Sequence, residues 1–90
     1  MTVCKRVVYR GRVQGVGFRA TALHLAENFK VTGTVRNGAD GSVELVVQGE
    51  PIEVNGLLVA VARRMGSYIA GQEVQDVATC PTLRGFHIIT

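Results

Sequence analysis

An α+β sandwich of the split βαβ, or ferredoxin-like, type is the fold that this sequence of 90 residues predicts. Three observations indicate it: two stretches with apolar residues at helical spacing, short β-rich runs around them, and a turn-rich link between the two middle runs. The resulting order is β, α, β, β, α, β. It places two helices on one face of a mainly antiparallel sheet. A chain this short is expected to form a single domain, residues 1–90.

The first part of the chain predicts a strand followed by a helix. Val7, Val8 and Tyr9 are typical of a strand. An apolar stripe then runs from Phe18 to Phe29 at positions i, i+4, i+7, i+8 and i+11, which lie along one face of a helix. Its members are Phe18, Ala22, Leu25, Ala26 and Phe29.

The middle of the chain predicts a β-hairpin. Residues 32–37 and 42–48 are expected to be its strands. Gly38-Ala39-Asp40-Gly41 joins them and is rich in residues that tolerate positive φ. Asn37 therefore stands at the end of one strand, immediately before the turn.

The last part predicts a second helix and further strands. Pro51 suits the first turn of the helix and Gly66 its end, whereas Asn55 and Gly56 weaken its start. Residues 73–79 and 86–89 are expected to be strands, separated by a segment with Pro81 and Gly85. The helical stripe consists of Val54, Leu57, Leu58, Val61, Ala62 and Met65.

The segment Gly11-Arg-Val-Gln-Gly-Val-Gly-Phe-Arg19 connects the first strand to the first helix. Gly15 and Gly17 allow positive φ and close approach of the backbone to a ligand. The first amides of a helix have no intrahelical partners and carry partial positive charge, so several can point at one oxyanion. Arg19 adds a planar fork that can meet two phosphate oxygens. The segment therefore predicts an anion site.

A Gly-x-Gly turn after a strand is common and by itself does not identify the type of anion site. The third glycine of a dinucleotide fingerprint is missing, because Ala20 stands there, and no Gly-Lys-Ser/Thr follows. The full nine-residue string, however, resembles the signature of the acylphosphatase family. A second segment strengthens the resemblance: Gly33-Thr-Val-Arg-Asn37, followed by Asp40-Gly-Ser-Val-Glu44 and Gly49. The resemblance covers most of the chain.

The resemblance implies a single acylphosphatase-like domain that hydrolyses the carboxyl-phosphate bond of small acyl phosphates to a carboxylate and inorganic phosphate. Arg19 is implied to bind the phosphoryl group and Asn37 to position the attacking water. The strand that ends at Asn37 is expected to lie beside the first strand. The implied phosphate-binding set is Gln14, Gly15, Val16, Gly17, Phe18 and Arg19.

The chemistry of this substrate class suits the residues. The motif contains no histidine, carboxylate or cysteine that could act as general acid, base or nucleophile. An acyl phosphate needs none, since its leaving carboxylate has a conjugate acid with a pKa of about 4. The resemblance implies that a phosphate oxygen of the substrate accepts the proton of the water. No cofactor and no metal are expected, because the acidic residues form no ligand-like spacing with His24 or His87, which are expected to be structural or surface side chains.

Composition limits the partners. The net charge of +3 and the pI near 9.3 suit an anionic ligand, but no basic run exceeds two residues, so nucleic acid is not expected. Among the arginines, Arg12 and Arg36 are those that could lie near the site. The longest apolar run, residues 57–62, is too short for a membrane span. We expect a cytoplasmic monomer that binds a small-molecule acyl phosphate, with free thiols at Cys4 and Cys80.

Other interpretations stay open at this stage. Taken alone, the glycine-rich turn could be a tight connection, Arg19 a solvated helix residue and Asn37 a turn former. A ferredoxin-like RNA-binding module would need exposed aromatic side chains on its central strands. A non-catalytic phosphate-binding domain is the main alternative, together with a regulatory domain resembling the N-terminal region of hydrogenase-maturation carbamoyltransferases. Because no zinc-ligand cysteine pairs follow up to Thr90, we expect a free-standing enzyme.

Overall fold

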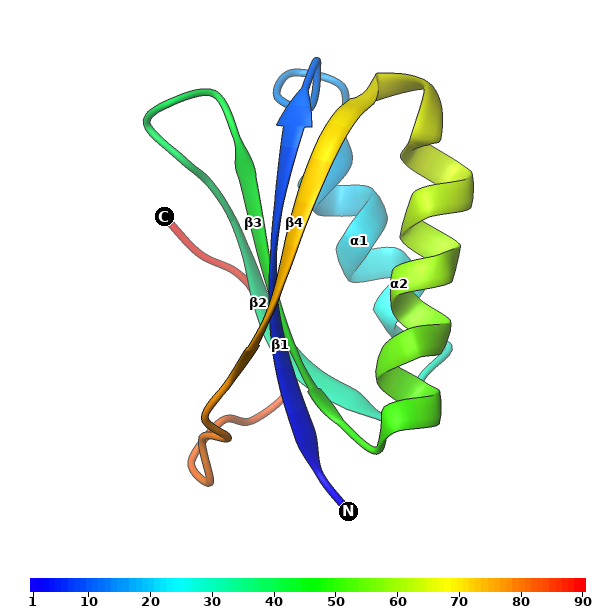
Figure 1. The fold of residues 1–90 in the computed structure, drawn as a ribbon, viewed down its shortest axis with the longest axis vertical. Helices are drawn as coiled ribbons and strands as arrows, with labels where there is room; N and C mark the ends of the chain where they lie inside the picture. The colour runs from blue at the N-terminus through cyan, green and yellow to red at the C-terminus, as the bar shows by residue number, and fades with distance from the viewer.

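Five strands form one sheet in the computed structural model, which describes residues 1–90 (Figure 1). The strand order is β4-β1-β3-β2-β5. In chain order the elements are β1 (Val3–Gly11), α1 (Phe18–Ala26), β2 (Val31–Asn37), β3 (Val43–Gly49), α2 (Pro51–Met65), β4 (Ile69–Val77) and β5 (Phe86–Ile88). A single 3-10 turn, Gly66–Tyr68, links α2 to β4.

The strand directions confirm the predicted ferredoxin-like fold. β3 is antiparallel to both β1 and β2, so β1 and β2 run in the same direction with β3 between them. β4 is antiparallel to β1, and only β5 pairs in parallel, with β2. Since β1 and β2 share a direction, their ends at Gly11 and Asn37 reach the same edge of the sheet. The expectation that the strand of Asn37 lies beside the first strand is wrong, because β3 separates the two.

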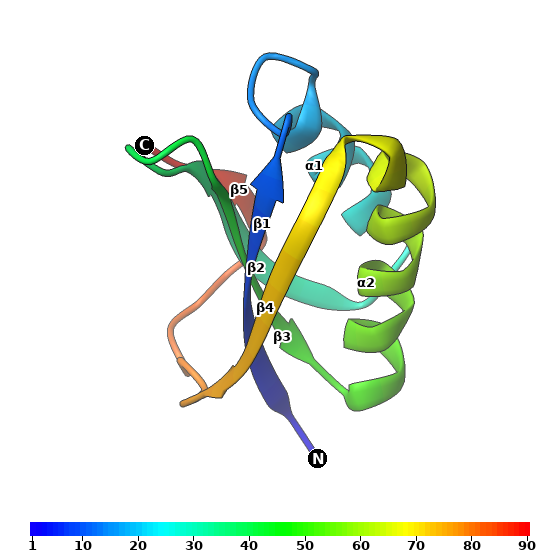
Figure 2. The same ribbon diagram turned by 45° about the horizontal axis from the view of Figure 1, so that its top comes forward.

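Both helices cover one face of the sheet, and the hydrophobic core lies between the two layers (Figure 2). Side chains of β1 that face the helices, Val7 and Tyr9, are buried there with Leu45 of β3 and Leu57 of α2. Each large apolar side chain buried in this way contributes roughly 1.5–3 kcal/mol, as an upper estimate. The two helical stripes supply the core as predicted, except that Ala62 is exposed.

The first helix is shorter than its apolar stripe. α1 ends at Ala26, and the amides of Glu27, Asn28 and Phe29 donate to carbonyls three residues earlier instead of four. This tighter turn directs Phe29 toward α2. There Gly56 makes room for its ring, because a Cβ at Gly56 would lie only 2.5 Å from Phe29 Cε1. The glycine that weakens the start of α2 thus permits the contact between the helices.

The fourth strand begins four residues earlier than expected and ends two residues earlier. Ile69 already pairs with Gly11, and Val77 is the last residue opposite β1, at Cys4. The following segment, residues 78–85, lies on the side of the sheet opposite the helices (Figure 2). Gln48 of β3 holds it there by accepting from the amide of Cys80 at 2.7 Å and donating to its carbonyl at 3.0 Å. None of the helices is long and apolar enough to cross a membrane.

Candidate active site

The loop between β1 and α1 begins at a close backbone contact. Gly11 has φ +130°, and a Cβ there would collide with the carbonyl of Tyr68 and the amide of Ala70. The pairing of β1 with β4 shifts register at this point, and the amide of Arg12 donates to the carbonyl of Tyr68 at 2.9 Å. The bulge turns the chain out of the sheet and into the loop, residues 12–17.

Gly15 and Gly17 both adopt the positive φ that the sequence predicted, at 77° and 78°. No atom lies within 4 Å of the position that a Cβ would take at either residue. Glycine is therefore required here by the backbone conformation and not by a lack of space.

The start of α1 offers unpaired backbone donors. Gly17 is the residue before the helix, and no side chain caps it. The first helical hydrogen bond is donated by the amide of Thr21 to the carbonyl of Gly17 at 2.9 Å. The amides of Phe18, Arg19 and Ala20 thus precede the intrahelical ladder.

Phe18 fixes this helix start in the core. Its side chain is 2% exposed, and its ring centroid lies 4.9 Å from that of Tyr9 on β1. Burial raises the pKa of the Tyr9 phenol above its ordinary value, so this side chain stays neutral at physiological pH.

One pocket of about 240 Å³ brings the two principal candidate residues together. Arg19 and Asn37 both contribute to its wall, although 18 positions separate them in the sequence. Both side chains are half-buried, and neither makes a hydrogen bond or an ion pair within the protein. The lining residues are Val13, Gly15, Gly17, Phe18, Arg19, Ala20, Asn37 and Ile88.

A profile of the acylphosphatase family matches residues 5–88. The chain belongs to the acylphosphatase family. An acylphosphatase of Lacticaseibacillus paracasei is 36% identical over 88 residues, which cover 96% of this chain and 95% of the relative. The crystal structure of an acylphosphatase from Bacillus subtilis has a TM-score of 0.86 and 27% identity, with 100% of both chains covered. The predicted family, fold and enzyme class are thereby confirmed.

The same fold also occurs as part of a longer protein. T. kodakarensis HypF matches with a TM-score of 0.80 and 23% identity, covering 100% of this chain but 12% of that protein. At this identity the likeness shows a shared fold alone.

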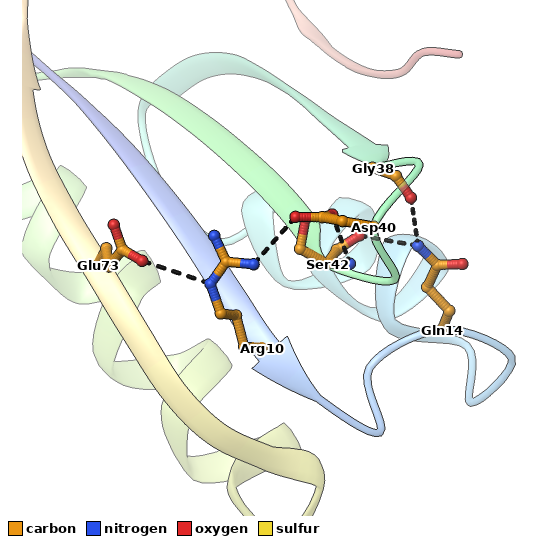
Figure 3. Close-up of polar contacts among 6 residues, drawn as sticks. All are labelled: Arg10, Gln14, Gly38, Asp40, Ser42 and Glu73. Atoms are coloured by element: carbon orange, nitrogen blue, oxygen red, sulfur yellow. Dashed lines mark hydrogen bonds and ion pairs between the residues drawn. The ribbon is translucent and has the colours of Figure 1, made fainter.

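Within the acylphosphatase signature, Gln14 and Val16 are not among the residues that line the pocket. The side chain of Gln14 instead reaches the turn between β2 and β3. Its Nε2 donates to the carbonyl of Gly38 at 2.8 Å and to that of Ser42 at 2.9 Å (Figure 3). This contact joins the loop to the turn that directly follows Asn37.

The other charged residues considered from the sequence lie apart from the pocket. Arg12 is exposed and does not line it. Arg36 binds Glu44 at 3.0 Å and belongs to a separate, charged hollow. His24 faces Glu27 at 3.4 Å, and His87 contacts the carbonyl of Arg84 at 2.6 Å. No group of three His, Cys, Asp or Glu side chains is arranged to hold a metal ion.

Sequence reasoning missed three of the four apolar residues in the pocket wall. Val13, Ala20 and Ile88 lie beside the polar groups. The sequence singled out Ala20 only because it stands where a dinucleotide fingerprint has its third glycine. Ile88 reaches the site because β5 pairs in parallel with β2, opposite Val35. No local signal in the sequence indicates that pairing.

Proposed function

We propose that this acylphosphatase-family chain hydrolyses small acyl phosphates by direct attack of a water on the phosphoryl group, yielding a carboxylate and inorganic phosphate. The observation that supports the proposal is the shared pocket, in which Arg19 and the positive-φ glycines meet Asn37. These are the residues that the family resemblance singles out.

The phosphoryl group is held by the loop amides and Arg19. Unpaired amides at the start of α1 satisfy oxygen lone pairs, and the guanidinium donates two parallel hydrogen bonds. Arg19 has no carboxylate partner in the protein, so its charge is not neutralised before a ligand arrives. A unit charge about 4 Å away attracts an anion by on the order of 4 kcal/mol near a protein surface, before desolvation is subtracted.

Asn37 orients the attacking water. Its carboxamide offers a donor and an acceptor without charge, so it does not repel the anionic phosphate. Positioning and electrostatic stabilisation account for most of the catalysis in phosphoryl transfer. A phosphate oxygen of the substrate accepts the proton of the water, and the carboxylate leaves without being protonated.

The size and lining of the pocket agree with a small substrate. Its volume of about 240 Å³ lies below the roughly 300–1,000 Å³ typical of sites for drug-sized ligands. None of its lining residues is a histidine, carboxylate or cysteine. A phosphate monoester, whose leaving alkoxide is far more basic, would lack the proton donor that it needs.

The cellular setting is part of the proposal. Since all the proposed site residues come from one chain, a monomer suffices for activity. Cys80 is an exposed free thiol, which agrees with the reducing cytoplasm. None of the five aromatic side chains is exposed, which weighs against an RNA-stacking surface.

The test is phosphate release from acetyl phosphate and benzoyl phosphate by the purified chain, with a chelator present and a phosphate monoester as comparison. We expect hydrolysis of both acyl phosphates, no effect of the chelator and no hydrolysis of the monoester. Binding of inorganic phosphate without turnover would favour the non-catalytic alternative. Loss of activity with the chelator would contradict the mechanism.

A further inference from the structure

The turn that follows Asn37 is closed by its own hydrogen bonds (Figure 3). Asp40 Oδ1 accepts from the backbone amide of Ser42 at 3.1 Å and from its hydroxyl at 2.5 Å. The amide of Gly38 donates to the carbonyl of Ser42 at 2.7 Å. Ser42 is 7% exposed, so the Ser42 end of each of these bonds is shielded from water.

The second carboxylate oxygen of Asp40 connects the turn to β1. Arg10 Nη1 donates to Asp40 Oδ2 at 3.0 Å, while Arg10 Nε donates to Glu73 Oε1 on β4 at 3.3 Å. Figure 3 shows the guanidinium between the two carboxylates. Arg10 directly precedes Gly11, where the chain leaves the sheet for the phosphate loop.

Two residues around the start of the phosphate loop therefore bind the turn. Arg10 binds it through Asp40, and Gln14, four residues later, binds the carbonyls of Gly38 and Ser42. The side chain of Asn37 has no hydrogen bond of its own in the protein. Its place relative to the loop consequently depends on its strand and on this turn.

We propose that Asp40 is a positioning residue for acyl phosphate hydrolysis: anchored by Arg10, it sets the turn that aligns Asn37 with the phosphate loop. The inference rests on the proposed role of Asn37 in placing the attacking water. Asp40 itself does not line the pocket and touches neither substrate nor water in this account.

The ion pair is too exposed to serve mainly stability. The side chains of Arg10 and Asp40 are 51% and 58% exposed, and pairs of this kind contribute little to folding. Displacing a catalytic group, in contrast, lowers turnover strongly even when the displacement is about 1 Å or less. Loss of Asp40 should therefore reduce kcat more than it reduces the folded population.

The test compares Asp40→Ala and Asp40→Asn with the unmodified chain, using benzoyl phosphate hydrolysis and binding of inorganic phosphate. We expect kcat to fall about tenfold in Asp40→Ala, with KM and the phosphate dissociation constant within about twofold. Asp40→Asn should lose less, because its amide oxygen can still accept from Ser42. Asp76→Asn is the matched control: it removes another ion pair that β1 makes, from Lys5 to Asp76 on β4 at 2.7 Å, and should leave kcat unchanged.

A double-variant experiment asks whether Asp40 acts through Asn37. In an Asn37→Ala background, measured at high enzyme concentration, Asp40→Ala should cause no further loss of kcat. If Asp40→Ala lowers kcat in the Asn37→Ala background by the same factor as in the otherwise unmodified chain, the inference is overturned. An unchanged kcat in Asp40→Ala, a parallel loss of phosphate affinity, or an equal effect of Asp76→Asn would also overturn it.

The proposed function fails on a different result. Normal turnover in the single variant Asn37→Ala would remove the water-positioning role. Impaired Asn37→Ala together with unimpaired Asp40→Ala would overturn only the positioning role of Asp40.

Discussion

Arg19 differs from the arginines of β1 and β2 in having no acidic partner. Arg6, Arg10 and Arg36 each bind a carboxylate, at distances of 2.6 to 3.3 Å. Arg19 follows Phe18, whose ring is fixed against Tyr9, so the arginine leaves a well-anchored stretch of backbone. A guanidinium held in this way is available for a ligand anion.

We predict that Arg19→Ala lowers kcat/KM for benzoyl phosphate by at least about a hundredfold, the effect of losing one strong oxyanion donor. Arg19→Lys should restore little of it, because an ammonium group cannot donate two parallel hydrogen bonds to a phosphate. Initial rates of phosphate release check both variants. Near-normal turnover in either one would rule out the role of Arg19.

The two cysteines should differ in reactivity. Burial raises the pKa of the Cys4 thiol, to which Cys80 adds, and the side chain is 3% exposed. Cys80 is exposed, and a hydrogen bond with Thr82 lowers its pKa. We predict that iodoacetamide modifies Cys80 well before Cys4, as followed by mass spectrometry of the native protein. Equal rates of modification at the two cysteines would contradict the difference in their burial and pKa.

Among the elements, the loop of residues 12–17 depends most on single residues. Its two positive-φ glycines permit a left-handed conformation that costs other residues about 1–2 kcal/mol. The conformation was predictable from the sequence, because glycine next to a helix start is a local signal. The contact of Gln14 with the turn at Gly38 was not predictable, since it joins residues 24 positions apart.

Gly15→Ala should lower the free energy of unfolding by about 1–2 kcal/mol and weaken phosphate binding, because the loop must strain or rearrange. Gly66→Ala is the control, since Gly66 has a right-handed helical backbone and open space around its Cβ position. Urea unfolding and phosphate titration measure both variants. If Gly15→Ala matches Gly66→Ala, the backbone conformation of the loop is not the constraint.

Helix and strand boundaries were predictable where local chemistry sets them. Pro51 and Gly66 mark the limits of α2 as expected. The predictions of where α1 ends and where β4 begins were wrong, because contacts between residues far apart in the sequence determine these two boundaries. Phe29 turns toward Gly56, and Ile69 pairs with Gly11 as soon as the 3-10 turn ends.

On the scale of the whole molecule, strand direction assembles the site. β1 and β2 run in the same direction, so the loop after one and the turn after the other meet at one edge of the sheet. The predicted order of elements therefore sufficed to expect Arg19 near Asn37. The order of elements did not predict that Ile88 lies at the site. The parallel pairing of β5 with β2 depends on the path of residues 78–85 over the face of the sheet opposite the helices.

The three central strands are also joined by charge. Glu44 on β3 accepts from Arg6 on β1 at 2.6 Å and from Arg36 on β2 at 3.0 Å. Burial alone would raise the pKa of Glu44, but the hydrogen bonds from Arg36 and Arg6 outweigh it and lower that pKa. We predict that Glu44→Gln reduces the free energy of unfolding by about 1 kcal/mol at pH 7, a value discounted for the half-exposed arginines.

The pH dependence of this effect has a defined sign. Because the pKa of Glu44 is lower in the folded chain, its contribution is complete above its ordinary pKa of about 4.3 and is lost as the pH falls below it. Unfolding by urea at pH 7 and near pH 3 should show the gap between the two proteins shrinking in acid. A gap of equal size at both pH values would mean that ionised Glu44 is not its source.

In the proposed mechanism the loop and Arg19 bind the anion, whereas Asn37 positions the attacking water. The most direct measurement is kcat for benzoyl phosphate and the dissociation constant of inorganic phosphate in Asn37→Ala. We expect kcat to fall at least about tenfold, because water placement acts on the transition state, while the phosphate dissociation constant stays within about twofold. Unchanged turnover, or equal losses of turnover and phosphate affinity, would contradict this mechanism.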